Sequence, residues 1–329
     1  MTERENALLA MHHQEPEWVP AVFDCVYNCN DVIGDRPLFE DGDDCFGIHW
    51  IRSGPETNFI THVDPNRPPV LEDVTQWREQ VKFPDLDQYD WEGEAALITP
   101  DIRREKLICY VMPLGIFERT HTLMRFEDAL CAYLEEPEEM YELCGALADY
   151  KIDLVHHIAK YLKPDLICYH DDWAMQTGPF LPKHVWEEII KPHTQRIYDA
   201  VKSYGINLVH HSCGKVESYI PDMLEMGIDG WNSCQSCNDL AGLKKQYGDR
   251  LVFWQALDDQ RVLGQKGTTD EMLREEAIRK TEMLAAGGGW LCGPTAFVSF
   301  IPEQDRKCDC YVKEYSKEYY AKRRQAREG

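Results

Sequence analysis

Two short segments of the sequence carry residues that could bind a transition metal. His211 and Cys213 stand two positions apart at the end of one apolar run, and Cys292 ends another run far downstream. Imidazole and thiolate groups are common zinc ligands, and a catalytic zinc ion uses three protein ligands while it keeps a fourth position open. These three residues therefore predict a zinc site that activates a sulfur, oxygen or cobalt-bound group.

The residue order in the first segment distinguishes its two histidines. Successive side chains of a strand point to opposite faces, so residues i and i+2 share a face. His211 can therefore share a metal ion with Cys213, whereas His210 points the other way and is not expected to be a ligand. The alternative at this point is structural, because cysteine is often a plain buried residue.

The other cysteines leave a second site open. Two residues separate Cys234 from Cys237, and with Cys308 and Cys310 this pair could form a structural four-cysteine zinc site or act in redox chemistry. The chain has thirteen cysteines, an odd number, and begins without the pattern of a signal peptide. Reduced thiols that bind no second metal are therefore the favoured interpretation.

Acidic residues follow two other apolar runs. Asp171 and Asp172 come after Leu166–Tyr169, and Glu118 follows Leu107–Met112 and a short turn. Acids at strand ends can orient a substrate or transfer protons, so these three are the candidate catalytic residues, and Glu118 could fill the open zinc position at rest. The alternative for the aspartates is helix capping. Candidate substrate contacts are the aromatic and cationic residues near the same strand ends, namely Phe117, Arg119, Tyr169, Trp173, Trp254 and Trp290.

Short apolar runs alternate with amphipathic helical patterns along the chain. The predicted strands are Val19–Phe23, Leu107–Met112, Leu166–Tyr169, Asn207–His211, Gly230–Asn232, Leu251–Ala256 and Gly289–Cys292. The predicted helices include Phe126–Leu134, Pro137–Lys160, Pro182–Ser203, Val216–Glu225 and Asp270–Leu284. This alternation is typical of parallel strands joined by crossover helices, whose functional groups gather at the carboxyl ends of the strands.

The strand count and the length favour one fold within the α/β class. The sequence predicts a single (α/β)8 TIM-type barrel domain over residues 1–329, with an elaborated, proline-rich N-terminal region. A doubly wound sheet is less favoured, because no glycine-rich nucleotide loop is found.

Charge and hydropathy narrow the classes of partner. The net charge of −23 repels phosphates, so nucleic acid is not an expected partner. No apolar stretch reaches the length of a membrane-spanning helix, and the expected location is the cytoplasm.

Taken together, these segments resemble the uroporphyrinogen decarboxylase superfamily over essentially the whole chain. The residues that carry the resemblance are Arg4–Leu8, Pro16–Pro20, Phe117–Arg119, Asp171–Trp173, His211–Val216, Ile220–Asp229 and Gly248–Trp254. The decarboxylases of this superfamily hold their porphyrinogen with an arginine-rich N-terminal motif and need no zinc. Ala21–Cys25 stands where that motif belongs, and few arginines lie nearby.

The resemblance is closer to the methyltransferase branch, which binds zinc through a His-x-Cys pair and a distant cysteine and works with corrinoid proteins. It implies that His211, Cys213 and Cys292 hold Zn²⁺ and that a methyl group moves between a small methylated substrate, for example a methyl ether, and the cobalt of a corrinoid (cobalamin) on a partner protein. Three alternatives stay open: a methylcorrinoid:thiol methyltransferase working in the opposite direction, a uroporphyrinogen decarboxylase of porphyrin biosynthesis, and a non-catalytic tetrapyrrole-binding protein. The sequence leaves a homodimer open as well.

Overall fold

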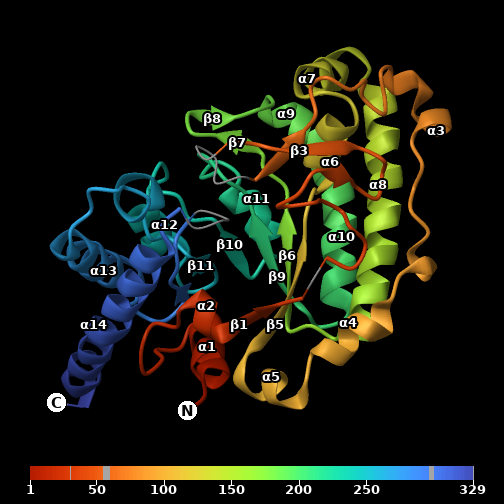
Figure 1. Cartoon of the computed structure of the whole chain (residues 1–329). Coiled ribbons are helices and arrows are strands. Elements are labelled where there is room, and N and C mark those ends of the chain that lie inside the picture. The colour runs from red at the N-terminus through yellow and green to blue at the C-terminus, as the bar shows by residue number, and fades with distance from the viewer. Residues whose placement is uncertain (30, 55–59, 296–299, 329) are drawn as a thin grey trace. The chain divides into compact units, whose positions relative to one another are not determined.

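The computed structural model describes residues 1–29, 31–54, 60–295 and 300–328, which fold into two compact units (Figure 1). Unit 1 comprises Met1–Tyr27, Thr99–Ile108 and Val209–Gly329, and unit 2 comprises Asn28–Ile98 and Cys109–Leu208. Each unit is therefore built from segments that are distant in the sequence. The single-domain prediction stays a prediction.

Unit 1 contains a set of short parallel strands. The strands pair side by side in the order β9 (Asn207–His211, of which the first two residues belong to unit 2), β10 (Gly230–Asn232), β11 (Val252–Trp254) and β12 (Trp290–Leu291). Every residue of β10, β11 and β12 is buried. Burial on both faces is the usual setting of parallel strands, and it explains why these segments read as continuous apolar runs.

Helices accompany these strands in unit 1. They are α1 (Glu3–Met11), α2 (Val22–Cys25), α5 (Pro100–Glu105), α11 (Ile220–Glu225), α12 (Leu240–Tyr247), the π-helical turn η6 (Asp259–Leu263), α13 (Asp270–Leu284) and α14 (Pro302–Glu328). The Oγ1 of Thr269 accepts a hydrogen bond from the backbone N–H of Met272 at 3.3 Å, which fixes where α13 begins. α13 packs along α14 (Figure 1).

Unit 2 combines a parallel pair with antiparallel strands. β5 (Leu107–Met112, of which the first two residues belong to unit 1) pairs in parallel with β6 (Leu166–His170). A three-stranded antiparallel sheet is formed by β2 (Gly42–Asp43), β3 (His49–Arg52) and β4 (Thr61–Val63), and a small hairpin by β7 (Ala174–Met175) and β8 (Gly178–Pro179). β1 (Val26–Asn28) crosses the boundary between the two units in the sequence.

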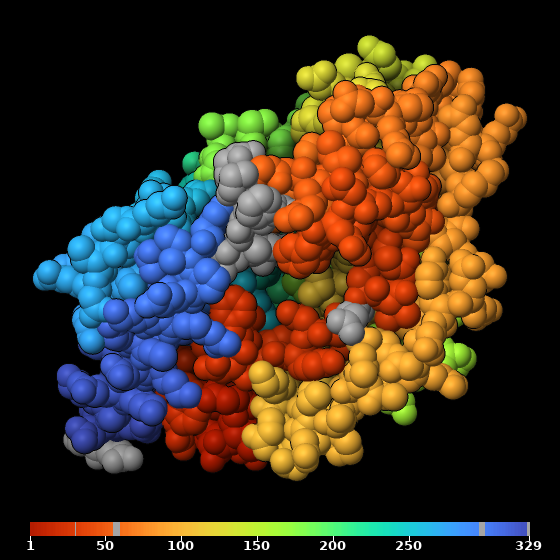
Figure 2. All heavy atoms as spheres, in the orientation of Figure 1, coloured from red at the N-terminus to blue at the C-terminus, as the bar shows by residue number. Residues whose placement is uncertain are grey.

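The helices of unit 2 pack on one another. They are η2 (Val74–Gln76), α3 (Trp77–Gln80), η3 (Leu86–Gln88), α4 (Trp91–Leu97), α6 (Ile116–Leu123), α7 (Phe126–Glu135), α8 (Pro137–His157), η4 (Ile158–Leu162), α9 (Lys183–Val185), η5 (Trp186–Ile190) and α10 (Lys191–Ser203). α8 lies against α10, and the N-terminal part of unit 2, drawn in orange, covers α8 in the view of Figure 2.

Buried charges join the N-terminal part of unit 2 to its helices. The fully buried guanidinium of Arg119 in α6 contacts the carboxylates of Asp35 and of Asp44, the latter at 2.6 Å. Lys151 in α8 donates to the other Asp35 oxygen at 2.6 Å. Burial alone would lower the pKa of Arg119, but the two aspartates outweigh it and raise that pKa. Each ion therefore has a partner where water cannot reach it.

The predicted α/β class is confirmed, with corrections to its details. The strands Leu107–Met112, Asn207–His211 and Gly230–Asn232 and the helix Asp270–Leu284 have the predicted bounds. The strand predicted at Val19–Phe23 is wrong, because this run enters α2 and only Ala21 forms a bridge, to Cys292. Seven strands rather than eight form the main sheet in the described residues, so an eight-stranded barrel stays a prediction. None of the helices described is both long and apolar enough to cross a membrane.

Candidate active site

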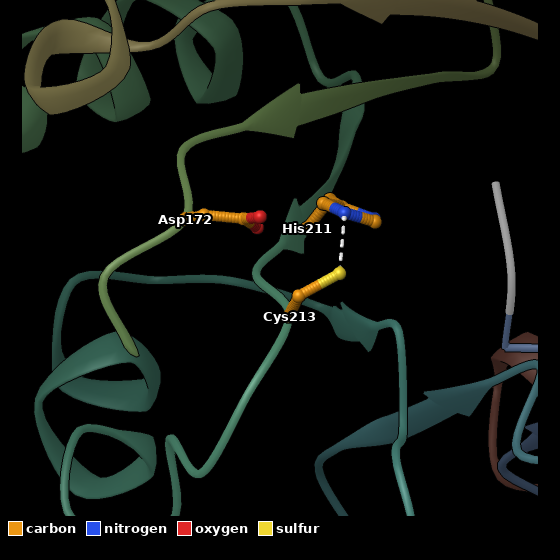
Figure 3. A group of neighbouring side chains, drawn as sticks. All are labelled: Asp172, His211 and Cys213. Carbon is orange, nitrogen blue, oxygen red and sulfur yellow. Dashed lines mark hydrogen bonds between the residues drawn. The ribbon is translucent and has the colours of Figure 1, made fainter. Parts of the chain in front are cut away.

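His211 and Cys213 come together at the carboxyl end of β9. His211 is the last residue of the strand, and its Nε2 lies 3.5 Å from the Sγ of Cys213 (Figure 3). The imidazole is buried and the thiol is half-buried. The shared face that strand alternation predicts for these two side chains is therefore observed. His210, the neighbour that was not expected to be a ligand, is fully buried.

Two amides orient the imidazole of His211. Its Nδ1 contacts the Oδ1 of Asn232, the last residue of β10, which stands opposite His211 in the register of the two strands. Because an amide oxygen can only accept, Nδ1 must carry the proton, and Nε2 keeps its lone pair. The Nδ2 of Asn232 donates to the Oε1 of Gln255 at 2.7 Å. The ring is thus held in the tautomer that a metal ion at Nε2 requires.

The loop after β9 is held by the loop after β10. The N–H of Gly214 donates to the Oε1 of Gln235 at 2.9 Å, and the N–H of Val216 donates to the Oδ1 of Asn238 at 2.9 Å. Asn238 also donates to the Gly214 carbonyl at 2.8 Å. Gly214 has a φ of +80°, which only glycine adopts without strain. These contacts fix the backbone that carries Cys213.

Sequence reasoning missed the residues that support this pair. Asn232 ends β10, Gln255 directly follows β11, and Gln235 and Asn238 lie in the loop after β10. Their signal was their position, since the carboxyl ends of parallel strands meet at one edge of a sheet. The register that sets Asn232 opposite His211 could not be read from either strand alone.

Cys292 lies elsewhere in unit 1. It follows β12, its backbone pairs with Pro20 and Val22, and its buried Sγ lies 3.7 Å from the Oδ1 of Asp309 in α14. Burial raises the pKa of the Cys292 thiol, and the Asp309 carboxyl adds to this effect. In the described part of the chain the structure does not bring Cys292 together with His211 and Cys213. The sequence argument ended this strand at Cys292, one residue beyond the observed end at Leu291, and did not consider which face bears the thiol.

The four other cysteines considered for a second metal do not gather either. Cys234 is fully buried and donates to the Trp231 carbonyl at 3.2 Å, while Cys237 lies 3.4 Å from the Nδ2 of Asn238. Cys308 is buried in α14 and Cys310 is exposed. No metal-binding group that includes them is found in the described residues, and all thirteen cysteines are free thiols.

The candidate acids belong to unit 2, where Asp171 has a structural role. Its carboxylate, fully buried, accepts hydrogen bonds from the N–H groups of Phe117 at 3.2 Å and Glu118 at 2.9 Å and from Trp173 Nε1 at 2.9 Å. Tyr169 adds its hydroxyl, which accepts from the N–H of Ile116 at 2.8 Å. Together they cap the first turn of α6. Burial raises the pKa of Asp171 to about 7, although these hydrogen bonds oppose the rise.

The approach of Asp171 to α6 depends on a glycine. A Cβ at Gly115 would lie 2.4 Å from the Cβ of Asp171, closer than any real contact. Asp172 follows in the same loop after β6 and is drawn in Figure 3.

Glu118 and Arg119 are adjacent in α6 but have different surroundings. Burial raises the pKa of Glu118 well above its ordinary value, and Asp172 and Asp171 raise it further, while Arg36 opposes them. The neutral form of the Glu118 carboxyl is therefore favoured over what an exposed glutamate would show. Arg119 was a candidate substrate contact, but its guanidinium is fully buried against Asp35 and Asp44 as described above.

The candidate aromatic contacts are buried in two different units. Phe117 and Trp173 are in unit 2, where Phe117 stacks on Phe180 with ring centroids 5.8 Å apart and Trp173 meets Trp186 edge-on at 4.8 Å. Trp254 and Trp290 are in unit 1, and Trp290 Nε1 donates to the Gln255 carbonyl at 2.6 Å. Phe117, Trp173 and Trp290 thus have partners within their own units.

Comparison with known proteins adds a family and a fold. A family model described as uroporphyrinogen decarboxylase (URO-D) matches residues 65–292. A methyltransferase from Methanosarcina mazei is similar in structure over 98% of this chain and 99% of its own, with a TM-score of 0.70 and 13% sequence identity, which shows a shared fold. Xylanase B from Clostridium stercorarium F9 overlaps 63% of this chain and 73% of its own at 14% identity, but a TM-score of 0.37 carries no argument. No curated protein matches the chain.

Proposed function

The chain belongs to the uroporphyrinogen decarboxylase family, and we propose that within this family it is a zinc-dependent methyltransferase. The methyl group would pass from a small methylated substrate to the cobalt of a corrinoid that a partner protein carries. One observation carries the proposal: the side chains of His211 and Cys213 lie 3.5 Å apart, with the imidazole oriented by Asn232. The fold shared with the Methanosarcina mazei methyltransferase agrees with it.

The residues present fit a zinc ion. Nε2 of His211 offers a lone pair, and the Sγ of Cys213, which now donates its proton to that nitrogen, offers a thiolate once the proton leaves. Nitrogen and sulfur are the donor types that zinc prefers. When bound, zinc would act as a Lewis acid on the heteroatom that carries the methyl group.

The chain's own residues would supply the remaining steps. Asn232 and Gln255 keep the imidazole in one tautomer. Glu118, whose pKa burial raises well above its ordinary value, is the proposed donor of a proton to the oxygen or sulfur atom that loses its methyl group. Two residues are candidates for the third zinc ligand. Cys292 is the candidate from the family resemblance, although its thiol contacts Asp309 in this structure. Asp172 is the candidate among the acids.

Metal analysis tests the zinc site without any assay of activity. The full chain, purified without chelators, should hold about one zinc ion per molecule. His211→Ala and Cys213→Ser should lose most of it, whereas Cys310→Ser, a substitution of an exposed thiol in α14, should keep it. Zinc that stays at the wild-type level in the first two variants would refute the site.

Absorption spectroscopy of the cobalt-loaded protein identifies the third ligand. Cys292→Ser and Asp172→Asn are each loaded with Co²⁺, whose thiolate charge-transfer band in the near ultraviolet counts bound sulfurs. If Cys292 is a ligand, its substitution weakens this band, and if Asp172 is the ligand, its substitution lowers metal content while the band per metal ion stays the same.

Activity separates this proposal from its alternatives. We expect the loaded protein to methylate cob(I)alamin from at least one methyl ether, thioether or methylamine, followed by the change in the cobalamin absorption spectrum. Decarboxylation of uroporphyrinogen by a metal-free chain would instead favour the decarboxylase. Methylation of a thiol by methylcobalamin would reverse the proposed direction.

A further inference from the structure

Unit 2 contains a pocket of about 670 Å³, and of its lining residues only Glu118 has a role in the proposed function. One side of the pocket is formed by β3, β4 and the segment that follows β4. The other side is formed by the helices α6 and α7. Its size is in the range of small-molecule sites, which are mostly apolar and hold a few polar groups that fix the ligand. Among the residues that line it, Arg36 is the one with a buried side-chain nitrogen that has no hydrogen-bond partner in the described part of the chain.

Arg36 brings an incompletely paired guanidinium to this pocket. Its Nη2 donates to the carbonyl of Thr61 at 2.7 Å, and the group lies over the ring of Trp50 at 4.8 Å from the centroid. Its Nε is buried and has no hydrogen-bond partner in the described part of the chain. A buried N–H of a charged group that lacks a partner costs free energy, and an anion that accepts from it would recover that cost.

The nearby acids do not compensate the charge of Arg36. Burial lowers the pKa of Arg36, and the opposing pull of Glu118 and Asp172 is too weak to reverse this. Burial raises the pKa of Glu118, which also lines the pocket, well above its ordinary value, and this favours the neutral form that can donate a hydrogen bond. Inside its exposed rim, the pocket therefore offers a ligand the guanidinium of Arg36 and the acid group of Glu118. This is a donor set for a single carboxylate, and a dianionic phosphate would need more cations.

The charged side chains at the rim of the pocket do not favour an anionic ligand over a cationic one. Arg67 and Arg125 are matched there by acids, namely Asp64, Glu127 and Asp128. Arg67 itself is exposed and lies 3.9 Å from Asp64. Selection for an anion therefore depends on Arg36.

Much of the remaining lining is apolar, and Thr61, His62 and Thr122 add polar groups to it. Phe126 leaves more than a third of its surface exposed, and Val63, Val70, Leu114 and Met124 share this lining. His121 meets Phe126 edge-on at 5.2 Å, and burial lowers its pKa to about 4, so the ring is neutral at physiological pH. The apolar part of this surface suits a hydrocarbon body.

We propose that this pocket binds a small organic acid, with its carboxylate on Arg36 and its apolar body against Met124 and Phe126. The site goes beyond the proposed function, because its binding test needs no zinc and no corrinoid. A failure of the zinc experiments would leave this site standing, and the reverse also holds.

Calorimetric titration of the full chain with two acids and their amides tests the proposal. The probes are benzoate and hexanoate, each compared with benzamide or hexanamide. We expect at least one acid to bind saturably and at least about tenfold more tightly than its amide, the difference that one charge-assisted contact in a buried site provides. Arg36→Met should remove this preference, and Arg67→Met at the exposed rim should leave it within about twofold.

A second variant keeps the test decisive if Arg36→Met does not fold. Val70→Trp fills the apolar part of the pocket and leaves Arg36 in place, so it should weaken the acid at least about tenfold. The proposal is overturned if neither acid binds more tightly than its amide, if folded Arg36→Met keeps the preference, or if Val70→Trp binds the acids as the wild type does. Tighter binding of inorganic phosphate than of either acid would also overturn it.

Discussion

Asn232 determines which nitrogen of His211 can accept a metal ion. Its Oδ1 takes the proton of Nδ1, and its own amide is held by Gln255, so neither group is free to turn. Partners of this kind fix the orientation of a ligating histidine and raise its basicity. Substitution of Asn232, which would not itself touch the metal, should therefore change the affinity for zinc.

We expect Asn232→Leu to weaken zinc binding about 10- to 100-fold, the usual effect of losing such a partner. Asn232→Asp keeps an acceptor for the Nδ1 proton and should restore most of the affinity. Competition with a chromogenic chelator measures both variants. Equal affinities in Asn232→Leu and the wild type would mean that the hydrogen bond to Nδ1 has no influence on the metal.

Asp259 should make the stability of the chain depend on pH. The carboxyl is buried and contacts the hydroxyl of Thr295. Burial raises its pKa from 3.8 to about 6, and Asp258 and Asp305 contribute. Between these two values the folded chain keeps a proton that the unfolded chain has released, so the stability contributed by this group falls as pH rises through that window.

Asp259→Asn removes this ionisation. Relative to the wild type, the variant should gain roughly 2–3 kcal/mol in free energy of unfolding between about pH 4 and about pH 8. Urea unfolding across this range gives the two curves. If they run parallel, the carboxyl does not titrate abnormally in the folded chain.

At the scale of elements, the loop after β6 is joined to the start of α6. Asp171 and Tyr169 accept from the N–H groups of three consecutive residues of that helix, Ile116, Phe117 and Glu118. The sequence placed Asp171 among the catalytic candidates and kept helix capping as the alternative. The contacts observed are those of a cap that is supplied from another element.

Asp171→Ala should therefore destabilise the chain by at least about 3 kcal/mol, because it leaves several buried N–H donors without a partner. Asp171→Asn keeps an acceptor and should cost less. Chemical denaturation measures both variants. A normal free energy of unfolding in Asp171→Ala together with lost methyl transfer would instead assign the residue to the chemistry.

The sequence predicted elements better than it predicted contacts. Asn207–His211 and Gly230–Asn232 were predictable because strands buried on both faces are short, continuous apolar runs. Val19–Phe23 has the same composition, but it enters a helical turn and contributes only one bridge. Apolar composition reports burial, and it cannot distinguish a strand from a buried turn.

The sequence could predict the candidate site only where the geometry of a single segment determines which side chains lie together. Alternation along one strand placed His211 beside Cys213, since both residues belong to the same segment. The environment of Cys292 depends on α14, and the role of Asn232 depends on the register between two strands. Arg119 was taken for a substrate contact because the acids that bury it are distant in the sequence.

At the scale of the whole molecule, thirteen free thiols differ widely in exposure. Cys131 and Cys310 are exposed, Cys45, Cys213 and Cys237 are intermediate, and the others are buried. Burial raises the pKa of thiols such as Cys25, Cys234 and Cys292, so these are poor nucleophiles in the folded chain.

Alkylation followed by peptide mass spectrometry should show this order. Cys131 and Cys310 should react first in the folded chain, and all thirteen thiols should react after unfolding. Zinc should slow the alkylation of Cys213 and leave that of Cys237 unchanged. Equal protection of both thiols would point to a general change in folding and away from a ligand at Cys213.

The buried charges of unit 2 limit how this chain could be recombined with its relatives. Asp35 and Asp44 belong to the segment before residue 98, and Arg119 and Lys151 to the segment after residue 109. A chimera that exchanges only one of the two segments would inherit buried ions from one parent and lack their partners from the other, at a cost of about 3–5 kcal/mol for each broken pair. These four positions must therefore be exchanged together, and a crossover point for library design belongs outside the interval from Asp35 to Lys151.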